Sequence, residues 1–457
     1  MFTPDSALAQ ASAEIKALQE SVASLDKKLS QLLSINSRAH EPQSSQPQTA
    51  FDVLTGPSMP KSRSTAALDR LNAHSISDSE EVAMATTRVV MHQIVLPSDT
   101  DALGICFGGQ VLGWIDVCAG LAAKTVARGP CVTASVDAVH FLRPCKVGSV
   151  AIIAAMVNRT FQSSLEVGVR VEEEDMLTGA RHHCCSAYLT FVSVMARPGP
   201  GRAAKRLPKI APGTQHQREI FRAAELRRQE RLVHRNKLKQ DPALAAQLAE
   251  SRLQPVTYRE ASPTLAPAIQ VQTVSGKKHG VTPDFTLAHM TQLIMPQHAN
   301  SLGITFGGQV MRWMEQCAYI AASRVGRGGH LLTGSMDSIV FTQPTRVGDV
   351  MYITAQVTGI FTSSAEVMIS VCGESPTVRE VFYCGDAFAT VVSVNRTGGT
   401  VDIPFTLEPE TTAEKQRCAG AEVRRQERLE MRCSLITQQA KRPSLDGSMQ
   451  IHSDSAV

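Results

Sequence analysis

The chain has 457 residues, of which 43% are hydrophobic and 19% charged, and its formal net charge is +4 at pH 7. This length allows two or three domains with buried cores, and the charge is too small for that size to indicate a nucleic-acid-binding surface. No run approaches the roughly 18 consecutive apolar residues that a membrane-spanning helix needs. We therefore expect no nucleic-acid role and no membrane span.

Eleven cysteines occur without a CxxC pair, and several stand inside apolar runs. This usage is typical of buried thiols in a reducing compartment rather than of disulfides or zinc ligands. The N-terminus has neither a long apolar run nor an Arg-rich face, and the C-terminus matches no peroxisomal or prenylation signal. We expect a cytoplasmic protein without a metal site.

The N-terminal residues 1–35 predict a short coiled-coil helix. Large aliphatic residues between positions 15 and 32 alternate spacings of three and four, which places them on one stripe and offers a surface for a coiled-coil partner. The alternative is one amphipathic helix docked on the protein's own surface. Residues 36–84 are rich in Ser, Pro, Gln and Ala and predict a disordered linker.

Residues 85–240 predict a buried helix followed by strands. Apolar residues surround most of the axis between Gln110 and Val126, so this helix must be enclosed. β-branched, alternating segments predict strands at Arg88–Leu96, Cys131–Leu142, Val150–Val157, Ser164–Glu172 and His183–Val194. A charged helical tail follows, at Arg218–Gln240. This order predicts an α+β unit in which an antiparallel sheet wraps around one helix.

The chain then repeats this unit. Residues 101–116 read DALGICFGGQVLGWID and residues 300–315 read NSLGITFGGQVMRWME, with nine identities in sixteen positions. The match continues with FQSSLEVGV beside FTSSAEVMI and RRQERL beside RRQERL. Residues 281–432 therefore predict a second copy with its own helical tail, after a linker at 241–280 and before a disordered tail at 433–457.

Each predicted central helix begins at a glycine pair. Glycines let a ligand approach the backbone, and the first amides of a helix point unsatisfied N–H groups outward with a partial positive charge. A developing oxyanion would find donors there, although the glycines are equally explained by a tight entry under a crowded sheet. The candidate oxyanion and ligand-binding residues are Gly108, Gly109, Gln110, Gly307, Gly308 and Gln309.

An acidic residue stands two turns further along each helix. Asp116 and Glu315 occupy equivalent places among apolar neighbours, where a carboxylate is costly to bury unless it is used or paired. A buried carboxylate with a raised pKa suits a general base, and a satisfied core carboxylate is the alternative. The loop before each helix differs between the copies, with Asp101 in the first and Asn300 in the second.

These features resemble the tandem hotdog-fold acyl-CoA thioesterases of the cytosol, in particular the acetyl-CoA hydrolase branch. The segments PQHANSLGITFGGQVMRWMEQCAYIAASR, CVTASVDAVHF and SSLEVG carry the resemblance, which covers residues 86–432. It implies two hotdog domains that form an intrachain pseudo-dimer, and a homo-oligomer that is a trimer of such tandems. The branch usually adds a lipid-binding START domain; we expect none within these 457 residues, so lipid regulation is not carried over.

The resemblance also implies reaction centres where the loop of one copy faces the helix of the other. Asn300 would then face Asp116, and Asp101 would face Glu315. The resemblance expects an Asn with an acid, so Asn300 with Asp116 predicts a competent site. Two facing acids oppose simultaneous ionisation, so Asp101 with Glu315 predicts an impaired second site.

The predicted reaction is hydrolysis of an acyl-CoA thioester, with the resemblance favouring acetyl or other short chains. Asp116 would act as general base on a water that Asn300 orients, and the amides of Gly308 and Gln309 would bind the carbonyl oxygen. Coenzyme A enters as part of the substrate, and no other cofactor is expected.

Several alternatives stay open. Ser164 and Ser364 recur on a strand with Glu166 and Glu366, either lining the CoA pocket or as alternating positions with Glu facing solvent. The charged tails are predicted to be solvated helices, and the less favoured alternative is that their arginines bind the phosphates of CoA. One rival function is a non-catalytic acyl-CoA sensor or scaffold that uses the coiled coil. A hotdog hydratase would pair Asp with His, and His298 lies in only one loop.

Overall fold

The computed structural model describes residues 81–194, 206–241, 246, 248–255, 278–326 and 329–439. The coiled coil expected at residues 1–35 lies outside the described residues, as does most of the linker expected at 36–84. The end of that linker belongs to the fold, since β1 (Glu81–Ala83) pairs in parallel with β8 (Lys209–Ala211). In the second copy, β9 (His279–Val281) pairs in the same way with β16 (Phe405–Leu407).

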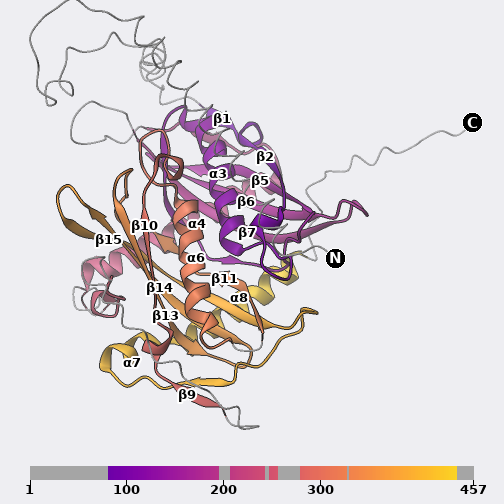
Figure 1. Cartoon of the computed structure of the whole chain (residues 1–457). Coiled ribbons are helices and arrows are strands. Elements are labelled where there is room, and N and C mark those ends of the chain that lie inside the picture. Colours follow the sequence, from indigo (N-terminus) through magenta and orange to yellow (C-terminus); the bar gives the residue numbers. More distant parts are fainter. Residues whose placement is uncertain are drawn as a thin grey trace, which may run out of the picture. The chain divides into compact units, whose positions relative to one another are not determined.

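In the first copy, antiparallel strands wrap around one helix, α3 (Gly108–Ala127), drawn in indigo and magenta in Figure 1. The strands are β2 (Val89–Ile94), β3 (Cys131–Val136), β4 (Val139–His140), β5 (Val150–Thr160), β6 (Ser164–Glu174) and β7 (Arg181–Ser193). Leu112, Ile115, Cys118 and Ala119 are fully buried, which confirms that the apolar residues around the helix axis enclose it beneath the sheet.

The second copy repeats this arrangement around α6 (Gly307–Ser323), in the orange and yellow part of Figure 1. Its strands are β10 (Ala288–Leu293), β11 (His330–Met336), β12 (Ile339–Val340), β13 (Val350–Ile360), β14 (Ser364–Ser375) and β15 (Glu380–Val394). Short 3-10 turns precede the edge strands and the central helices, at Met84–Thr87, Pro97–Asp99, Pro283–Thr286 and Pro296–His298.

The two copies exchange short strands. The first sheet has the order β12-β3-β7-β6-β5-β2 and the second has β10-β13-β14-β15-β11-β4, so each sheet ends in a two-residue strand from the other copy. Ser335 pairs with His140, and Val340 pairs with Ser135. Each copy is therefore a hotdog domain, and the two form an intrachain pseudo-dimer with α3 against α6.

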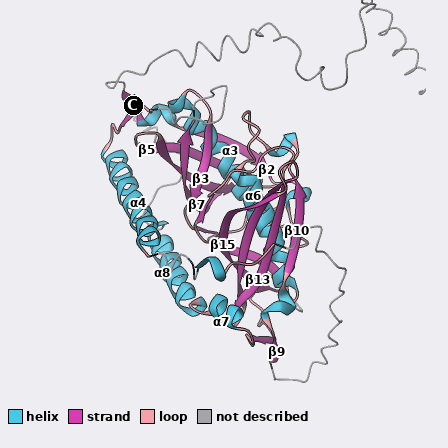
Figure 2. Cartoon of the chain, turned by 90° about the vertical axis from the view of Figure 1, so that its left-hand side faces the viewer, coloured by secondary structure: helices cyan, strands magenta, loops and turns pink. Residues whose placement is uncertain are grey.

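A helical tail follows each domain, and both tails run along the outside of the sheets (Figure 2). The first is α4 (Gln215–Gln240). The second, expected as one helix, is two: α7 (Thr412–Cys418) and α8 (Ala421–Gln439). The break falls at Gly420, whose φ of +79° is the left-handed conformation that glycine adopts without strain. Residues 433–439, expected to be disordered, form the last turns of α8.

The tails are anchored by buried ion pairs with the sheets. Glu166 and Glu366 are 0% exposed, which corrects the alternative that they face solvent. Arg227 of α4 lies 2.6 Å from Glu166, and Arg424 of α8 lies 2.6 Å from Glu366. The tail arginines therefore neutralise carboxylates inside the sheets, rather than only the acids on their own helices.

Part of the segment expected as a linker at 241–280 packs on the second sheet. Leu253 is buried, and its N–H donates to Ser370 Oγ at 3.2 Å. Arg252 pairs with Asp386 at 3.2 Å and stacks over the Tyr383 ring. In the part of the chain that the structure describes, no helix has the length and apolar character needed to cross a membrane.

Candidate active site

Asp116 lies in the middle of α3 with its carboxylate against the first turn of α6. It is 3% exposed. Its Oδ2 accepts a hydrogen bond from the Gly308 amide at 2.9 Å, and its Oδ1 accepts one from the Thr133 hydroxyl at 2.7 Å. Burial raises the pKa of Asp116 above its ordinary value, while these two hydrogen bonds act in the opposite direction. A buried carboxylate is thus held by one group from its own copy and one from the other.

Thr133 reaches Asp116 from a β-bulge. The register between β3 and β7 shifts between Thr133 and Ser135, and the same shift occurs at Thr333 in β11. A bulge changes which way a side chain points, and bulges are frequent beside active sites. In both copies the bulge therefore aims a threonine hydroxyl at the helix carboxylate.

Glu315 is held in a related but different way. It is 2% exposed, and its Oε1 accepts hydrogen bonds from the Gly108 amide at 2.9 Å and from Thr333 Oγ1 at 2.6 Å. Burial raises its pKa, as for Asp116. The longer side chain reaches the first amide of α3, whereas Asp116 reaches only the second amide of α6. Asp116 therefore leaves the first amide of its partner helix open.

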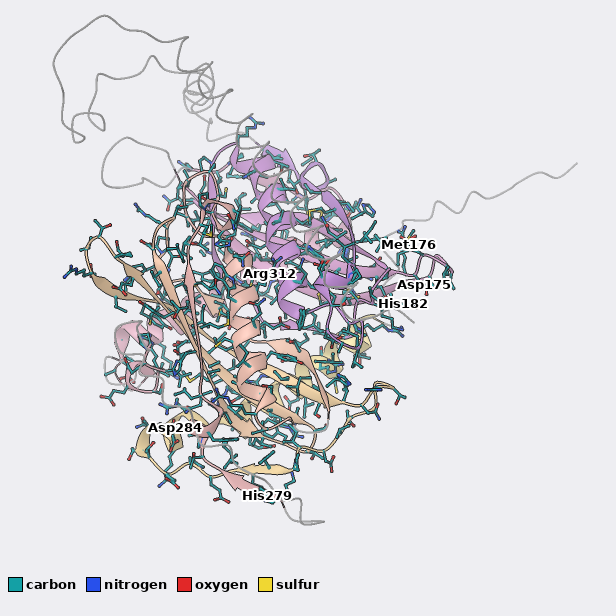
Figure 3. All side chains as sticks on the ribbon, in the orientation of Figure 1. Asp175, Met176, His182, His279, Asp284 and Arg312 are labelled. Atoms are coloured by element: carbon teal, nitrogen blue, oxygen red, sulfur yellow. The ribbon has the colours of Figure 1, made fainter. Side chains whose placement is uncertain are left out.

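The central helices approach closely because both begin with glycine. A Cβ on Gly308 would lie 2.7 Å from Asp116 Cβ and 2.9 Å from Gly113 Cα. A Cβ on Gly109 would lie 2.8 Å from Arg312 Cα. Figure 3 labels Arg312 where the ribbons of α3 and α6 meet. The glycine pairs thus bring each carboxylate to the opposite helix terminus, and this requirement explains them independently of any ligand.

The loop residues Asn300 and Asp101 present different atoms to the site. Asn300 Oδ1 accepts hydrogen bonds from the backbone of Leu302 and Ile304, at 2.9 and 3.2 Å. In the same way, Asp101 Oδ1 accepts hydrogen bonds from the backbone of Leu103 and Ile105, at 2.8 and 3.0 Å. The side-chain atom left over is an NH₂ donor on Asn300 but a carboxylate oxygen on Asp101. The two loops therefore share the same side-chain-to-backbone hydrogen bonds, but Asn300 has a donor left over where Asp101 has an acceptor.

Two large cavities lie at the interface between the copies. One, of about 810 Å³, brings together Asn300, Asp116, Thr133 and Gly307, with Lys124 and Arg346 also among its lining residues. The other, of about 510 Å³, brings together Asp101, Glu315, Thr333 and Gly108, with four arginines: Arg143, Arg425, Arg428 and Arg432. We call them the Asp116 cavity and the Glu315 cavity. Loop and helix residues thus line shared cavities in the cross-copy pairing that the family resemblance implied.

The backbone amides expected to bind the carbonyl oxygen are not free to do so. Gly308 N–H donates to Asp116, and Gln309 N–H donates to the Phe306 carbonyl at 3.1 Å. The two amides proposed for the carbonyl oxygen therefore already have acceptors. The Gly307 amide, by contrast, has no hydrogen-bond acceptor among the described residues, and Gly307 lines the Asp116 cavity. It is the better candidate for an oxyanion donor.

The remaining predicted residues are divided between cavity walls and the surrounding structure. Ser364 lines the Glu315 cavity. The others, Gly109, Gln110, Gly308, Gln309 and Ser164, line neither of the two. The sequence analysis missed Thr133 and Thr333, although both copies carry a Thr four residues before the Asp of the matching SVDAVHF and SMDSIVF segments.

The chain is thus a hotdog pseudo-dimer with a buried carboxylate on each central helix. The family model described as "Thioesterase superfamily" matches residues 103–180 and 302–380. Mouse acyl-coenzyme A thioesterase 11 is 32% identical over 78% of this chain and 55% of its own length. The Bacillus subtilis protein named uncharacterized acyl-CoA thioester hydrolase YkhA is 31% identical, over 36% of this chain and 92% of its own length. The chain belongs to the thioesterase superfamily.

The chain is also similar to a protein of known structure. An acyl-CoA hydrolase from Staphylococcus aureus, in complex with butyryl coenzyme A, coenzyme A and coenzyme A disulfide, is 29% identical. The match covers 36% of this chain and 99% of that chain, with a TM-score of 0.33. The present chain spans about half the length of the first curated relatives it matches, 55% and 48%.

Proposed function

We propose that this protein hydrolyses acyl-CoA thioesters to the free acid and coenzyme A, with the reaction in the Asp116 cavity. The observation that carries the proposal is a buried carboxylate, fixed by Thr133 and Gly308, in a cavity of about 810 Å³ between the two copies. The names of the relatives support the same chemistry. Coenzyme A enters with the substrate, and the protein needs no other cofactor.

In this mechanism, Asp116 removes a proton from a water molecule that attacks the thioester carbonyl. Burial raises the pKa of Asp116, which makes its ionised form a stronger base. The Asn300 NH₂ group orients the water, and the open Gly307 amide donates to the carbonyl oxygen as it becomes negative. A lone pair on the oxyanion of the tetrahedral intermediate then expels the CoA thiolate, which takes the proton from Asp116 to become the thiol and returns Asp116 to its ionised form.

The Glu315 cavity is proposed as a site impaired for hydrolysis. Glu315 already occupies the first amide of α3, so that amide is not available to an oxyanion. Asp101 offers a second carboxylate oxygen where Asn300 offers a donor, which disfavours ionisation of Glu315. Both differences reduce the capacity of this cavity to act as a base with an oxyanion hole.

The assembly and the cellular location are part of the same proposal. From the resemblance, we propose a trimer of tandem hotdogs in the cytoplasm that binds no nucleic acid. Residues 15–32 would supply any coiled-coil contact with a partner.

The test is thiol release from acyl-CoA by purified variants with matched changes in the two cavities. Asp116→Asn and Asn300→Ala should each lower kcat by on the order of a hundredfold or more, because each removes a group that acts in the transition state. The counterparts Glu315→Gln and Asp101→Ala should retain most of the activity. Normal turnover by folded Asp116→Asn would refute the assignment, and thioester binding without any turnover by the wild type would favour the sensor.

A further inference from the structure

The Asp116 cavity has an apolar arm that extends further along its central helix than the Glu315 cavity does. Beyond Asp116, the arm follows α3, and its residues on that helix are Val117, Gly120, Leu121 and Lys124. Its residues on and beside the sheet are Pro130, Cys131, Val132, Phe191 and Val194. In the Glu315 cavity the lining residues of α6 are only Glu315 and Tyr319. The larger cavity therefore continues about two helical turns past its carboxylate, and the smaller one ends after one turn.

Two substitutions between the copies account for the difference. Tyr319 stands in α6 where Gly120 stands in α3, and Leu331, the second residue of β11, stands where Cys131 begins β3. The Tyr319 ring packs edge-on against Phe107, with ring centroids 6.1 Å apart, so it is fixed at the end of the Glu315 cavity. On the helix side, Tyr319 therefore closes in the second copy the space that is open beside Gly120 in the first. On the sheet side, Leu331 narrows the cavity, which Leu332 and Val394 still line.

The arm has the length and surface of a site for a hydrocarbon chain. Eight residues separate Asp116 from Lys124, which corresponds to about 12 Å along a helix. An extended chain with tetrahedral carbons advances roughly 1.25 Å per carbon. Phe191 is buried in the wall, while Val117 and Leu121 are 43% and 44% exposed at the rim. Exposed aliphatic side chains beside a cavity gain from contact with an apolar ligand.

We infer that this arm binds the acyl chain, and that the substrates are acyl-CoA esters of roughly eight to ten carbons in preference to acetyl-CoA. Gly120 and Cys131 are the residues that determine chain length. The inference rests on the proposed hydrolysis and narrows its substrate class, whereas the resemblance alone favoured acetyl or other short chains. Each methylene buried in the arm should be worth roughly fourfold in affinity, before losses from chain ordering.

The experiment compares kcat/KM for acetyl-, butyryl- and octanoyl-CoA. The wild type should favour octanoyl-CoA over acetyl-CoA by on the order of tenfold or more. Gly120→Tyr and Cys131→Leu introduce the second copy's residues from opposite walls, so one remains informative if the other does not fold. Each should remove the octanoyl preference while butyryl-CoA turnover changes much less. A Cβ on Gly120 would lie 3.8 Å from Phe191, so Gly120→Ala is sterically allowed and should have an intermediate effect.

The control is Ile320→Tyr, which adds the same bulk to an exposed position of α6 that lines neither cavity. It should keep the wild-type chain-length profile. Equal losses for all three substrates in both variants, or a wild-type preference for acetyl-CoA, would overturn the inference. If no thioester is hydrolysed, the proposed function fails. The affinities for the thioethers S-ethyl-CoA and S-octyl-CoA then decide whether the arm binds an acyl chain. Tighter octyl binding that Gly120→Tyr and Cys131→Leu abolish supports the arm, and equal affinities reject it.

Discussion

At the scale of single residues, the burial of Asp116 couples stability to turnover. Its pKa is raised above the ordinary 3.8 by burial, so the folded chain holds the proton more tightly than the unfolded chain does. This contribution to stability is fully present below about pH 3.8 and is lost as the pH rises through the folded-state pKa. The proposed reaction needs the ionised form, so activity should increase over the pH range in which this stability is lost.

Replacing Asp116 with Asn tests this coupling. The free energy of unfolding, measured by urea denaturation from pH 4 to 8, should fall less steeply with pH in Asp116→Asn than in the wild type. Because Glu315 also has a raised pKa from burial, Glu315→Gln should flatten the curve in the same way but leave thiol release nearly intact. A pH dependence of stability unchanged in both variants would show that neither carboxylate titrates differently on folding.

Also at this scale, the site shows what residue types reveal and what they do not. Asp116 and Glu315 stand out in the sequence because acids are rare in such apolar helices. Thr133 does not stand out, because a threonine in a strand is ordinary. Only the bulge beside it turns the hydroxyl toward Asp116. For a similar reason the sequence did not reveal that the Gly308 amide, one of the two expected oxyanion donors, already donates to a side chain from the other copy.

At the scale of elements, the crossing of α3 and α6 positions the chemistry. Each helix presents its first turn to a carboxylate halfway along the other, so the partial positive charge of one terminus faces the negative group of the other helix. That contact depends on glycine at the crossing, because side chains there would overlap the opposite backbone. The tails contribute differently, by neutralising the buried Glu166 and Glu366.

A methyl group at Gly308 should therefore lower stability and kcat more than a methyl group at a glycine with more space around it. In Gly308→Ala, the new Cβ would lie 2.7 Å from Asp116 Cβ, so the helices must separate. We expect a loss of about 1–3 kcal/mol in the free energy of unfolding, together with a large loss of kcat. Gly129→Ala, where the nearest atom would be 3.6 Å away, is the control. If thermal unfolding and thiol release match in the two variants, close approach at Gly308 is not required.

At the scale of the whole molecule, duplication within one chain has let two equivalent cavities diverge. The Asp116 cavity combines a donor side chain, an open helix amide and a long apolar arm. The Glu315 cavity has a second acid, an occupied amide and a closed arm, and it is lined by four arginines. Since both cavities need residues from both copies, neither hotdog domain alone holds a complete site.

This divergence predicts that a second site can be rebuilt. In an Asp116→Asn background, the pair Asp101→Asn and Glu315→Asp should restore measurable thiol release, roughly tenfold or more above the parent variant. The shorter aspartate in place of Glu315 would release the Gly108 amide, and the asparagine in place of Asp101 would supply the missing donor. Because Tyr319 still ends this cavity on the helix side and Leu331 narrows it on the sheet side, the rebuilt site should act on butyryl-CoA and poorly on octanoyl-CoA. No recovery with any acyl length would mean that further differences silence this cavity.

The sequence by itself determined the duplication, the two enclosed helices and the succession of strands along the chain, because repeats and hydrophobic periodicity are local properties that survive without coordinates. The pairing of opposite copies was implied by the family resemblance. It did not determine the break at Gly420, the inward ion pairs of the tails, the Thr133 contact or the arm behind Asp116. Those depend on contacts between residues far apart in the chain, where a one-residue bulge or the volume of one side chain changes the result. Only the tertiary structure brings such residues together.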